Sequence, residues 1–223
     1  MGTIAEVLSL SPLFNHLTTE QIQDLFSDQD CYIKCFSAGE NIFELGSRYA
    51  NCGIIVKGMV DVTHSNPNGS EIIVNRYNVG GLLGESFHIT QEINNVALIR
   101  ANNNCSVFFF DLRHMLEKHW SGKYDDYIHI ISQNYMKILA RTNTLLNQKI
   151  HVLTQKTLRE KLMLYFSLLA AESGSNQIML PFNRENLAQY VNGERSSVSR
   201  ELSKMQAENL IIINGNNLQL LYL

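Results

Sequence analysis

The stretch NRENLAQYVNGERSSVSRELSKMQAEN, residues 183–209, decides how the C-terminal part of the chain folds. Its first half has an amphipathic helical pattern, whose apolar face is Leu187, Ala188 and Val191. Asn192-Gly193 then predicts a tight turn. A second helix follows, and its buried side is expected to consist of apolar residues at i, i+4 and i+7: Val198, Leu202 and Met205. The stretch therefore predicts a helix-turn-helix.

The opposite side of the second helix carries hydroxyl and basic side chains. We expect the following residues to project from the fold: Arg195, Ser196, Ser197, Ser199, Arg200, Ser203 and Lys204. Such groups contact phosphates and guanine edges in a major groove. A polar helix face is, taken alone, more often just solvated surface. The turn, the early arginine and the β-rich run that follows favour a winged helix-turn-helix that binds duplex DNA.

The flanking segments complete a compact α/β unit around this stretch. Ahead of it we expect a helix over 154–172 and a short strand over 178–180. After it, the Ile- and Leu-rich run over 210–222 predicts a hairpin with Asn214-Gly215 at its tip.

A long helix is predicted to precede this unit, because the segment from about 124 to 152 contains no Pro or Gly. Its stripe of residues at alternating spacings of three and four consists of Ile128, Ile131, Tyr135, Ile138, Thr142, Leu145, Lys149 and Val152, widened by Leu139, Leu146 and Leu153. The stripe either packs on the β domain of its own chain or pairs with a second copy in a parallel coiled coil. Its length favours the second, so we predict a homodimer whose contact residues are Ile128, Ile131, Tyr135, Ile138, Thr142 and Leu145.

The N-terminal part reads as short helices followed by a β domain. Helical spacing over 4–28 gives way, between Cys31 and Asp111, to short runs rich in Ile, Val, Phe and Tyr separated by glycine-containing turns. The clearest hairpin joins 58–63 to 71–76 through Asn66-Pro-Asn-Gly-Ser70.

The predicted fold class is accordingly α+β. We expect an N-terminal antiparallel, jelly-roll-like β-barrel sensor domain with helices over 1–123, a dimerisation helix over 124–153 and a winged helix-turn-helix domain over 154–223.

Composition narrows the setting in which such a chain works. A net charge of -3 means that any DNA contact must come from a local basic patch. The N-terminus has no basic signal region and no apolar run is long enough to cross a bilayer, which indicates a cytoplasmic protein without a membrane partner. Four cysteines without CxxC spacing indicate reduced thiols.

Sequence motifs of enzymes are missing from the chain. It has no HxH pair, GxSxG, Walker loop or HExxH, so we expect no enzyme activity. A barrel enzyme and a bare ligand-binding module stay as lesser alternatives, and the second leaves 183–222 unexplained.

Motifs along nearly the whole chain resemble those of the Crp/Fnr superfamily of bacterial transcription regulators. They are AGE at 38–40, the strand 58–62, GGLLGES at 80–86, ALIRANNNC at 97–105 and NLAQYVNGERSSVSRELSKMQAENLI at 186–211. The resemblance implies recognition contacts from Arg195, Ser196, Ser199 and Arg200, a palindromic operator, and RNA polymerase as a further partner. Ser196 stands where well-known members have a glutamate, so their half-site cannot be assumed.

The same resemblance points to an effector pocket, for which the candidates are Gly84, Glu85, Ser86, Asn95 and Val96. Members that bind cyclic AMP hold its phosphate with an arginine and a small neighbour, where this chain has Asn95 and Val96. Cyclic AMP is therefore disfavoured, and a cyclic-nucleotide regulator with a non-standard phosphate site is the alternative. Arg100 is not an obvious substitute, since a structural pairing is the commoner role. Glu85 either contacts the ligand or pairs near the glycine-rich loop.

A redox or gas signal is the other possible input, and the sequence leaves the cofactor unknown. An iron-sulfur cluster is disfavoured, because the first cysteine, Cys31, already lies at the start of the barrel. Haem ligation by His16, His64, His88 or a cysteine stays open, although lone histidines are more often surface residues. Cys31 and Cys35 share one side of a strand, which keeps thiol sensing open.

Overall fold

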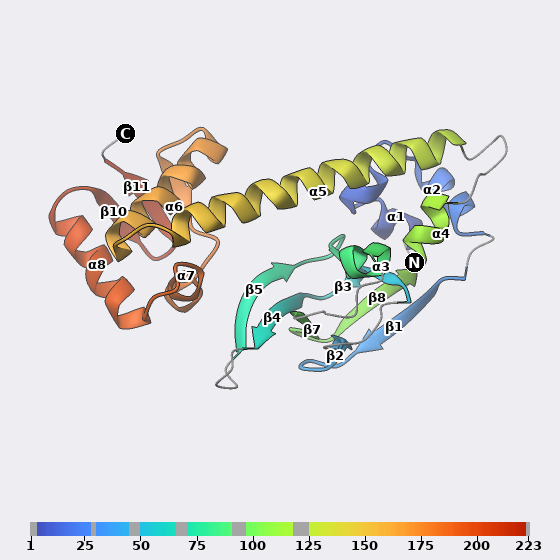
Figure 1. Ribbon diagram of the computed structural model, residues 1–223, viewed down its shortest axis with the longest axis horizontal. Helices are drawn as coiled ribbons and strands as arrows, with labels where there is room; N and C mark the ends of the chain where they lie inside the picture. The colour runs from blue at the N-terminus through green and yellow to red at the C-terminus, as the bar shows by residue number, and fades with distance from the viewer. Residues whose placement is uncertain are drawn as a thin grey trace. The chain divides into compact units, whose positions relative to one another are not determined.

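The computed structural model describes residues 4–27, 30–44, 50–65, 71–90, 97–117 and 125–221. The chain divides into two compact units, residues 1–140 and 141–223, here called the β unit and the helical unit (Figure 1). None of the described helices is long and apolar enough to span a membrane.

Strands dominate the β unit. They are β1 (Tyr32–Phe36), β2 (Asn41–Phe43), β3 (Cys52–Lys57), β4 (Val60–Ser65), β5 (Glu71–Tyr77), β6 (Leu82–Leu83), β7 (Ala97–Ala101) and β8 (Cys105–Phe110). Among the described residues they form two antiparallel four-stranded sheets, ordered β1-β8-β3-β6 and β2-β7-β4-β5. This arrangement confirms the predicted antiparallel β domain.

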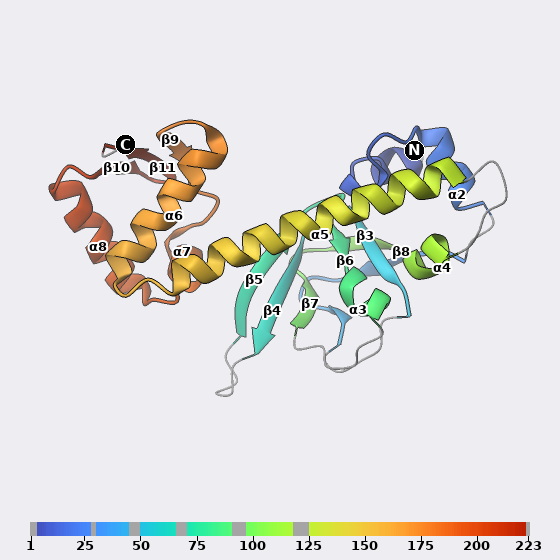
Figure 2. The same cartoon turned by 45° about the horizontal axis from the view of Figure 1, so that its top comes forward.

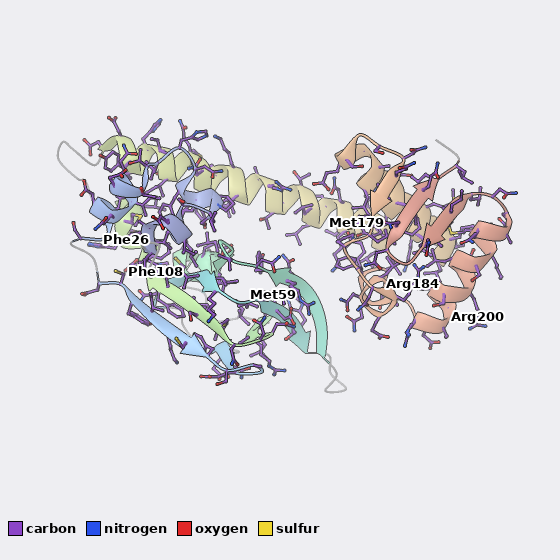
Figure 3. The ribbon with its side chains drawn as sticks, turned by 180° about the vertical axis from the view of Figure 1, so that it is seen from behind. Phe26, Met59, Phe108, Met179, Arg184 and Arg200 are labelled. Atoms are coloured by element: carbon purple, nitrogen blue, oxygen red, sulfur yellow. The ribbon has the colours of Figure 1, made fainter. Side chains whose placement is uncertain are left out.

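The first sheet is covered on both faces, which explains the continuous apolar run of β8. Val107 and Phe109 pack between the two sheets, whereas Phe108 and Phe110 pack beneath the helices. Phe26 meets Phe108 edge-on, with ring centroids 4.9 Å apart (Figure 3). A strand buried on both faces loses the polar alternation of a surface strand.

A layer of helices lies over the outer face of the first sheet. Its members are α1 (Ile4–Leu8), η1 (Pro12–Phe14), α2 (Thr19–Leu25), α4 (Leu112–Glu117) and the first half of α5 (Asp125–Leu153), while α3 (Glu85–Thr90) follows β6. Figure 2 shows α5 beside α1 and α2, above β3. The Asn134 side chain donates to the carbonyl oxygens of Leu13 and Asn15, at 3.1 and 2.7 Å, which ties α5 to this layer.

The hairpin predicted around residue 68 is confirmed in its strands. β4 and β5 pair antiparallel from Val60 opposite Tyr77 to Ser65 opposite Glu71. The predicted tip, 66–70, lies outside the described residues.

The helical unit is a set of helices on a small sheet. After the end of α5 it contains α6 (Leu158–Ser173), β9 (Gln177–Met179), α7 (Arg184–Tyr190), α8 (Arg195–Ala207), β10 (Ile211–Asn214) and β11 (Asn217–Leu220). Its described strands form one sheet, ordered β10-β11-β9.

Two local predictions in this unit were wrong by a few residues. The helix expected from residue 154 starts at Leu158, because Thr157 caps it: the Thr157 hydroxyl accepts from the Glu160 N–H, and the Glu160 carboxylate accepts from the Thr157 N–H. The hairpin tip is Gly215-Asn216, since Asn214 pairs with Asn217. Gly215 supplies the positive φ, +59°, that a two-residue turn requires.

Candidate nucleic-acid interface and cavity of the β unit

A short turn joins α7 to α8 as the sequence predicted, but its two residues, Asn192 and Gly193, have different structural roles. Asn192 adopts the left-handed conformation, with φ +52°, while Gly193 does not. A side chain at Gly193 would put its Cβ 3.3 Å from Leu158 Cδ1, so this glycine permits close packing on α6. The Gly193 N–H donates to the Ala188 carbonyl at 2.8 Å and closes the turn.

Both helices bury the faces that their spacing predicted. Every residue of the two predicted apolar sets is at most 2% exposed: Leu187, Ala188, Val191, Val198, Leu202 and Met205. Burial of these six side chains fixes which side of α8 faces outward.

The outward side of α8 carries the predicted polar set. Exposed members are Arg195, Ser196, Arg200, Ser203 and Lys204, and half-buried members are Ser197 and Ser199. Arg200 lies on the outer side of α8 (Figure 3), where its Nε donates to the Ser196 carbonyl at 3.3 Å. This local bond leaves the rest of the guanidinium directed to solvent, with donors in the fork geometry that reads a guanine edge.

Arg159 of α6 neutralises Glu201 of α8 and Glu208, which directly follows that helix. Its guanidinium donates to Glu201 at 2.6 Å and to both carboxylate oxygens of Glu208 at 2.6 and 2.9 Å. The hydrogen bond from Arg159 lowers the pKa of Glu208, and the two carboxylates raise the pKa of Arg159. Sequence reasoning missed Arg159, because it lies 42 residues from Glu201. Arg159 thus neutralises two acids near the exposed Arg200 and Lys204, while Arg195 lies 3.9 Å from the Glu185 carboxylate.

The β unit contains a cavity of about 110 Å³, partly open to solvent. Its described lining residues are Val62, Tyr77, Leu82, Leu83, Gly84, Glu85, Ser86, Ala97 and Ile99. Three effector candidates, Gly84, Glu85 and Ser86, thus share one cavity. The other two, Asn95 and Val96, lie outside the described residues. Sequence reasoning missed the apolar lining, although alternation along β7 could have indicated Ala97 and Ile99.

Glu85 is the charged group of the described lining, and burial raises its pKa, against the effect of hydrogen bonds from its backbone and Ser86. Burial also raises the pKa of Tyr77, and the charge of Glu85 adds to that shift. The pKa of Tyr135 on α5 rises to about 12, through burial and then through the charge of Glu85. Glu85 therefore acts electrostatically on both the cavity and α5.

Arg100 has the structural role that the sequence favoured. Its neighbours Ala97 and Ile99 line the cavity, whereas its own Nε donates to Asn41 Oδ1 at 3.1 Å. Strand alternation turns it away from the cavity.

The candidate metal ligands are dispersed. His16 and His64 are exposed, whereas His88 is fully buried, with Nε2 2.9 Å from Asp111 Oδ1, so the expectation of a surface residue was wrong for His88. Three or more His, Cys, Asp or Glu side chains do not converge on a metal-sized site anywhere in the described part of the chain.

The two cysteines considered for thiol sensing have different surroundings. Cys31 is half-buried and Cys35 is exposed, with its Sγ 3.4 Å from the Ser106 hydroxyl. Burial raises the pKa of the Cys31 thiol, and the charge of Asp30 adds to this. A raised pKa lowers the thiolate fraction that redox sensing needs.

The apolar stripe predicted along α5 is used in two ways. Ile131 and Tyr135 are buried in the core of their own β unit, and Ile128 and Ile138 pack against that core. For these four residues the less favoured alternative, packing on the β domain of the same chain, is therefore correct. Val152 is buried in the helical unit. Thr142 and Leu145 are exposed.

A second stripe of α5, called the exposed stripe below, consists of Met136, Leu139, Asn143, Leu146 and Ile150. Its four apolar members are 41 to 60% exposed. Their spacing of 3, 4, 3 and 4 is that of coiled-coil a and d positions, with Asn143 as the one polar member.

Comparisons with known proteins agree with both units. A family model described as a cyclic nucleotide-binding domain matches residues 33–119, and one described as a Crp-like helix-turn-helix domain matches residues 160–223. None of the curated proteins compared with the chain matches it.

Several solved structures share the fold over most of the chain. CLP of Xanthomonas campestris, described as a c-di-GMP responsive global regulator, has a TM-score of 0.62 at 17% identity, covering 91% of this chain and 99% of that one. A mutant of CooA from Carboxydothermus hydrogenoformans has a TM-score of 0.65 at 16% identity, covering 92% and 87%. A CRP-family transcriptional regulator from Thermus thermophilus has a TM-score of 0.52 at 21% identity, covering 84% and 91%. The two matched family models, which together cover most of the chain, show that it belongs to the Crp/Fnr superfamily of DNA-binding transcription regulators, and the shared fold agrees with this.

Proposed function

We propose that the chain is a sequence-specific regulator that binds a palindromic operator as a homodimer, under the control of a small effector in the β unit. The observation that carries this proposal is the outer face of α8. Within 195–207, all of which is described, it exposes Arg195, Arg200 and Lys204, while Arg159 holds Glu201 and Glu208. A basic, hydroxyl-bearing helix face beside a β hairpin suits the major groove.

The direct test is selection of duplexes from a random-sequence library. We expect an enriched palindrome with half-sites about 34 Å apart, one helical turn, because two recognition helices related by a twofold axis read equivalent grooves. Affinity should fall steeply with salt, since phosphate contacts release counterions. Lack of salt-sensitive affinity for any duplex, with candidate effectors supplied, would exclude the proposal.

The dimer is proposed to form through the exposed stripe of α5 rather than through the residues buried in the β unit. Leucines at d positions and a lone asparagine at an a position favour a parallel two-stranded coiled coil in fixed register. In functional terms the chain then has a sensing segment at 1–123, a dimerisation helix at 124–153 and a DNA-reading segment at 154–223.

A pair of neighbouring leucines makes this assignment testable. Leu146 belongs to the exposed stripe, whereas Leu145 belongs to the other one, and both are exposed, at 56% and 48%. We expect Leu146→Glu to give monomers in sedimentation at micromolar concentration and Leu145→Glu to stay dimeric. The reverse result would assign the dimer to the other stripe, and a monomeric wild type, with or without DNA, would exclude the dimer.

We further propose that effector binding shifts the equilibrium between two arrangements of the dimer helices, with a hinge near 151–155, and so sets the spacing of the recognition helices. RNA polymerase is the proposed further partner, and the cytoplasm is where such a regulator meets its DNA.

The alternative is a cyclic-nucleotide regulator with a non-standard phosphate site. The match of the cyclic nucleotide-binding family model to 33–119 favours it. Calorimetry with cyclic AMP and cyclic GMP separates the two proposals, and we expect no binding.

A further inference from the structure

The size and walls of the cavity limit what it can hold. Its volume is about 110 Å³. An apolar cavity of about 150 Å³ accepts a single benzene molecule, so this smaller, partly open cavity encloses part of a ring and leaves the rest of the ligand at its opening. Most of the described lining is aliphatic: Val62, Leu82, Leu83, Ala97 and Ile99. An apolar ligand body is therefore favoured.

The polar groups of the lining are an acid and two hydroxyls. Glu85 and Ser86 begin α3, and Tyr77 ends β5. A carboxylate accepts several hydrogen bonds, so Glu85, which already accepts from its own backbone and from Ser86, can also accept from a donor group of a ligand in the cavity.

The described lining of the cavity contains no Lys or Arg side chain. The sequence contains no Lys or Arg from Tyr77 to Ile99 or from Gly58 to Asn75, which includes the undescribed segments 66–70 and 91–96. The adjacent arginines are engaged: Arg76 Nε donates to Asp61 at 2.6 Å, and Arg100 Nε donates to Asn41 at 3.1 Å. An anionic group placed beside Glu85 would be desolvated next to a like charge.

We infer that the cavity binds a small, mostly apolar ligand whose donor group, above all an ammonium, bonds to the Glu85 carboxylate, and that it rejects anions. The inference rests on the proposed function, in which the same cavity receives the effector. It goes beyond that proposal by naming the ligand chemistry.

Three probes with the same ring and different charge test this inference on the full chain: benzylammonium, benzyl alcohol and benzoate. We expect calorimetry to rank benzylammonium first, with benzoate at least about tenfold weaker, because a charge-assisted bond to a carboxylate is replaced by repulsion. Glu85→Gln should remove most of the advantage of benzylammonium over benzyl alcohol. Glu6→Gln removes the same charge from an exposed position of α1 and should leave the ranking unchanged.

Three results would overturn the inference: benzoate binding as tightly as benzylammonium, an unchanged ranking in folded Glu85→Gln, or no binding of any probe at millimolar concentration. Duplex selection, run on the same preparation, separates this failure from failure of the proposed function. If the protein selects a palindrome but does not rank the three probes as expected, only the assignment of the ligand is wrong.

Discussion

Basic side chains have opposite surroundings in the two units. In the β unit, Arg76 is held by the Asp61 carboxylate and Arg100 by the Asn41 amide. In the helical unit, Arg200 projects from α8 into solvent. Arg159 of α6 donates to the carboxylates of Glu201 and Glu208. The arginines next to the cavity are thus held by partners, whereas α8 presents basic side chains to solvent.

This difference underlies both proposals, a polyanion bound by α8 and a cavity that rejects anions. Exposed guanidinium and ammonium groups bind phosphates with little desolvation cost. A half-buried cavity whose charged member is a carboxylate does the reverse. Four substitutions test the contrast.

The largest effect is expected for Leu202→Ala, which removes a buried side chain from the side of α8 opposite its exposed basic residues. Leu202 is 2% exposed in the core of the helical unit. Its truncation should lower the free energy of unfolding by about 2–5 kcal/mol, through lost burial and a residual cavity. Chemical denaturation followed by circular dichroism measures this. Leu145→Ala, at an exposed leucine of α5, is the control, and equal losses would contradict the assignment.

Arg200→Ala should weaken specific DNA binding by about 1–3 kcal/mol, because one two-pronged guanine contact disappears. Stability should stay within about 0.5 kcal/mol, as is usual for an exposed residue without a buried partner. Titration of the selected operator by fluorescence anisotropy measures the affinity. Equal affinity of variant and wild type would remove Arg200 from the interface.

Arg76→Ala should have the opposite effect to Arg200→Ala: a loss of stability without a loss of DNA affinity. The substitution leaves Asp61, whose side chain is 11% exposed, with the Asn102 amide still donating to it at 2.7 Å. Because Arg76 itself is 40% exposed, solvent screening reduces the expected loss to about 1 kcal/mol. A weaker operator complex with unchanged stability would break the contrast between the units.

Arg159→Ala is expected to lower stability by less than Leu202→Ala or Arg76→Ala, and its effect should depend on pH. Arg159 lowers the pKa of Glu208 in the folded chain. The ion pair therefore stabilises the fold at neutral pH, and this contribution is lost as the pH falls through the lowered pKa and the carboxylate is protonated. Denaturation of variant and wild type should differ at pH 7 and converge in acid. A difference that grows in acid would contradict this linkage.

The helical unit was largely predictable because its chemistry is local. Periodicity placed Val198, Leu202 and Met205 inside, and so placed Arg195, Ser196 and Arg200 outside, since a helix relates both faces within a few residues. The errors, at Leu158 and at Gly215-Asn216, concern boundaries, where a cap or the pairing of two strands decides the residue.

The cavity could be located from the sequence but not described. GGLLGES pointed to Gly84, Glu85 and Ser86, yet the walls come from β4, β5 and β7, which are distant along the chain. Pairing of the strands decides which side chains meet there and turns Arg100 away.

The sequence by itself determined the order of the domains, the helix-turn-helix and its outward residues, because each depends on periods of two or 3.6 residues within one segment. Only the tertiary structure decided that Ile131 and Tyr135 belong to the β unit, that Leu139 and Leu146 stay exposed, and that Arg159 holds the acids of α8. These outcomes depend on contacts between residues far apart in the chain, which packing selects and local periodicity does not encode.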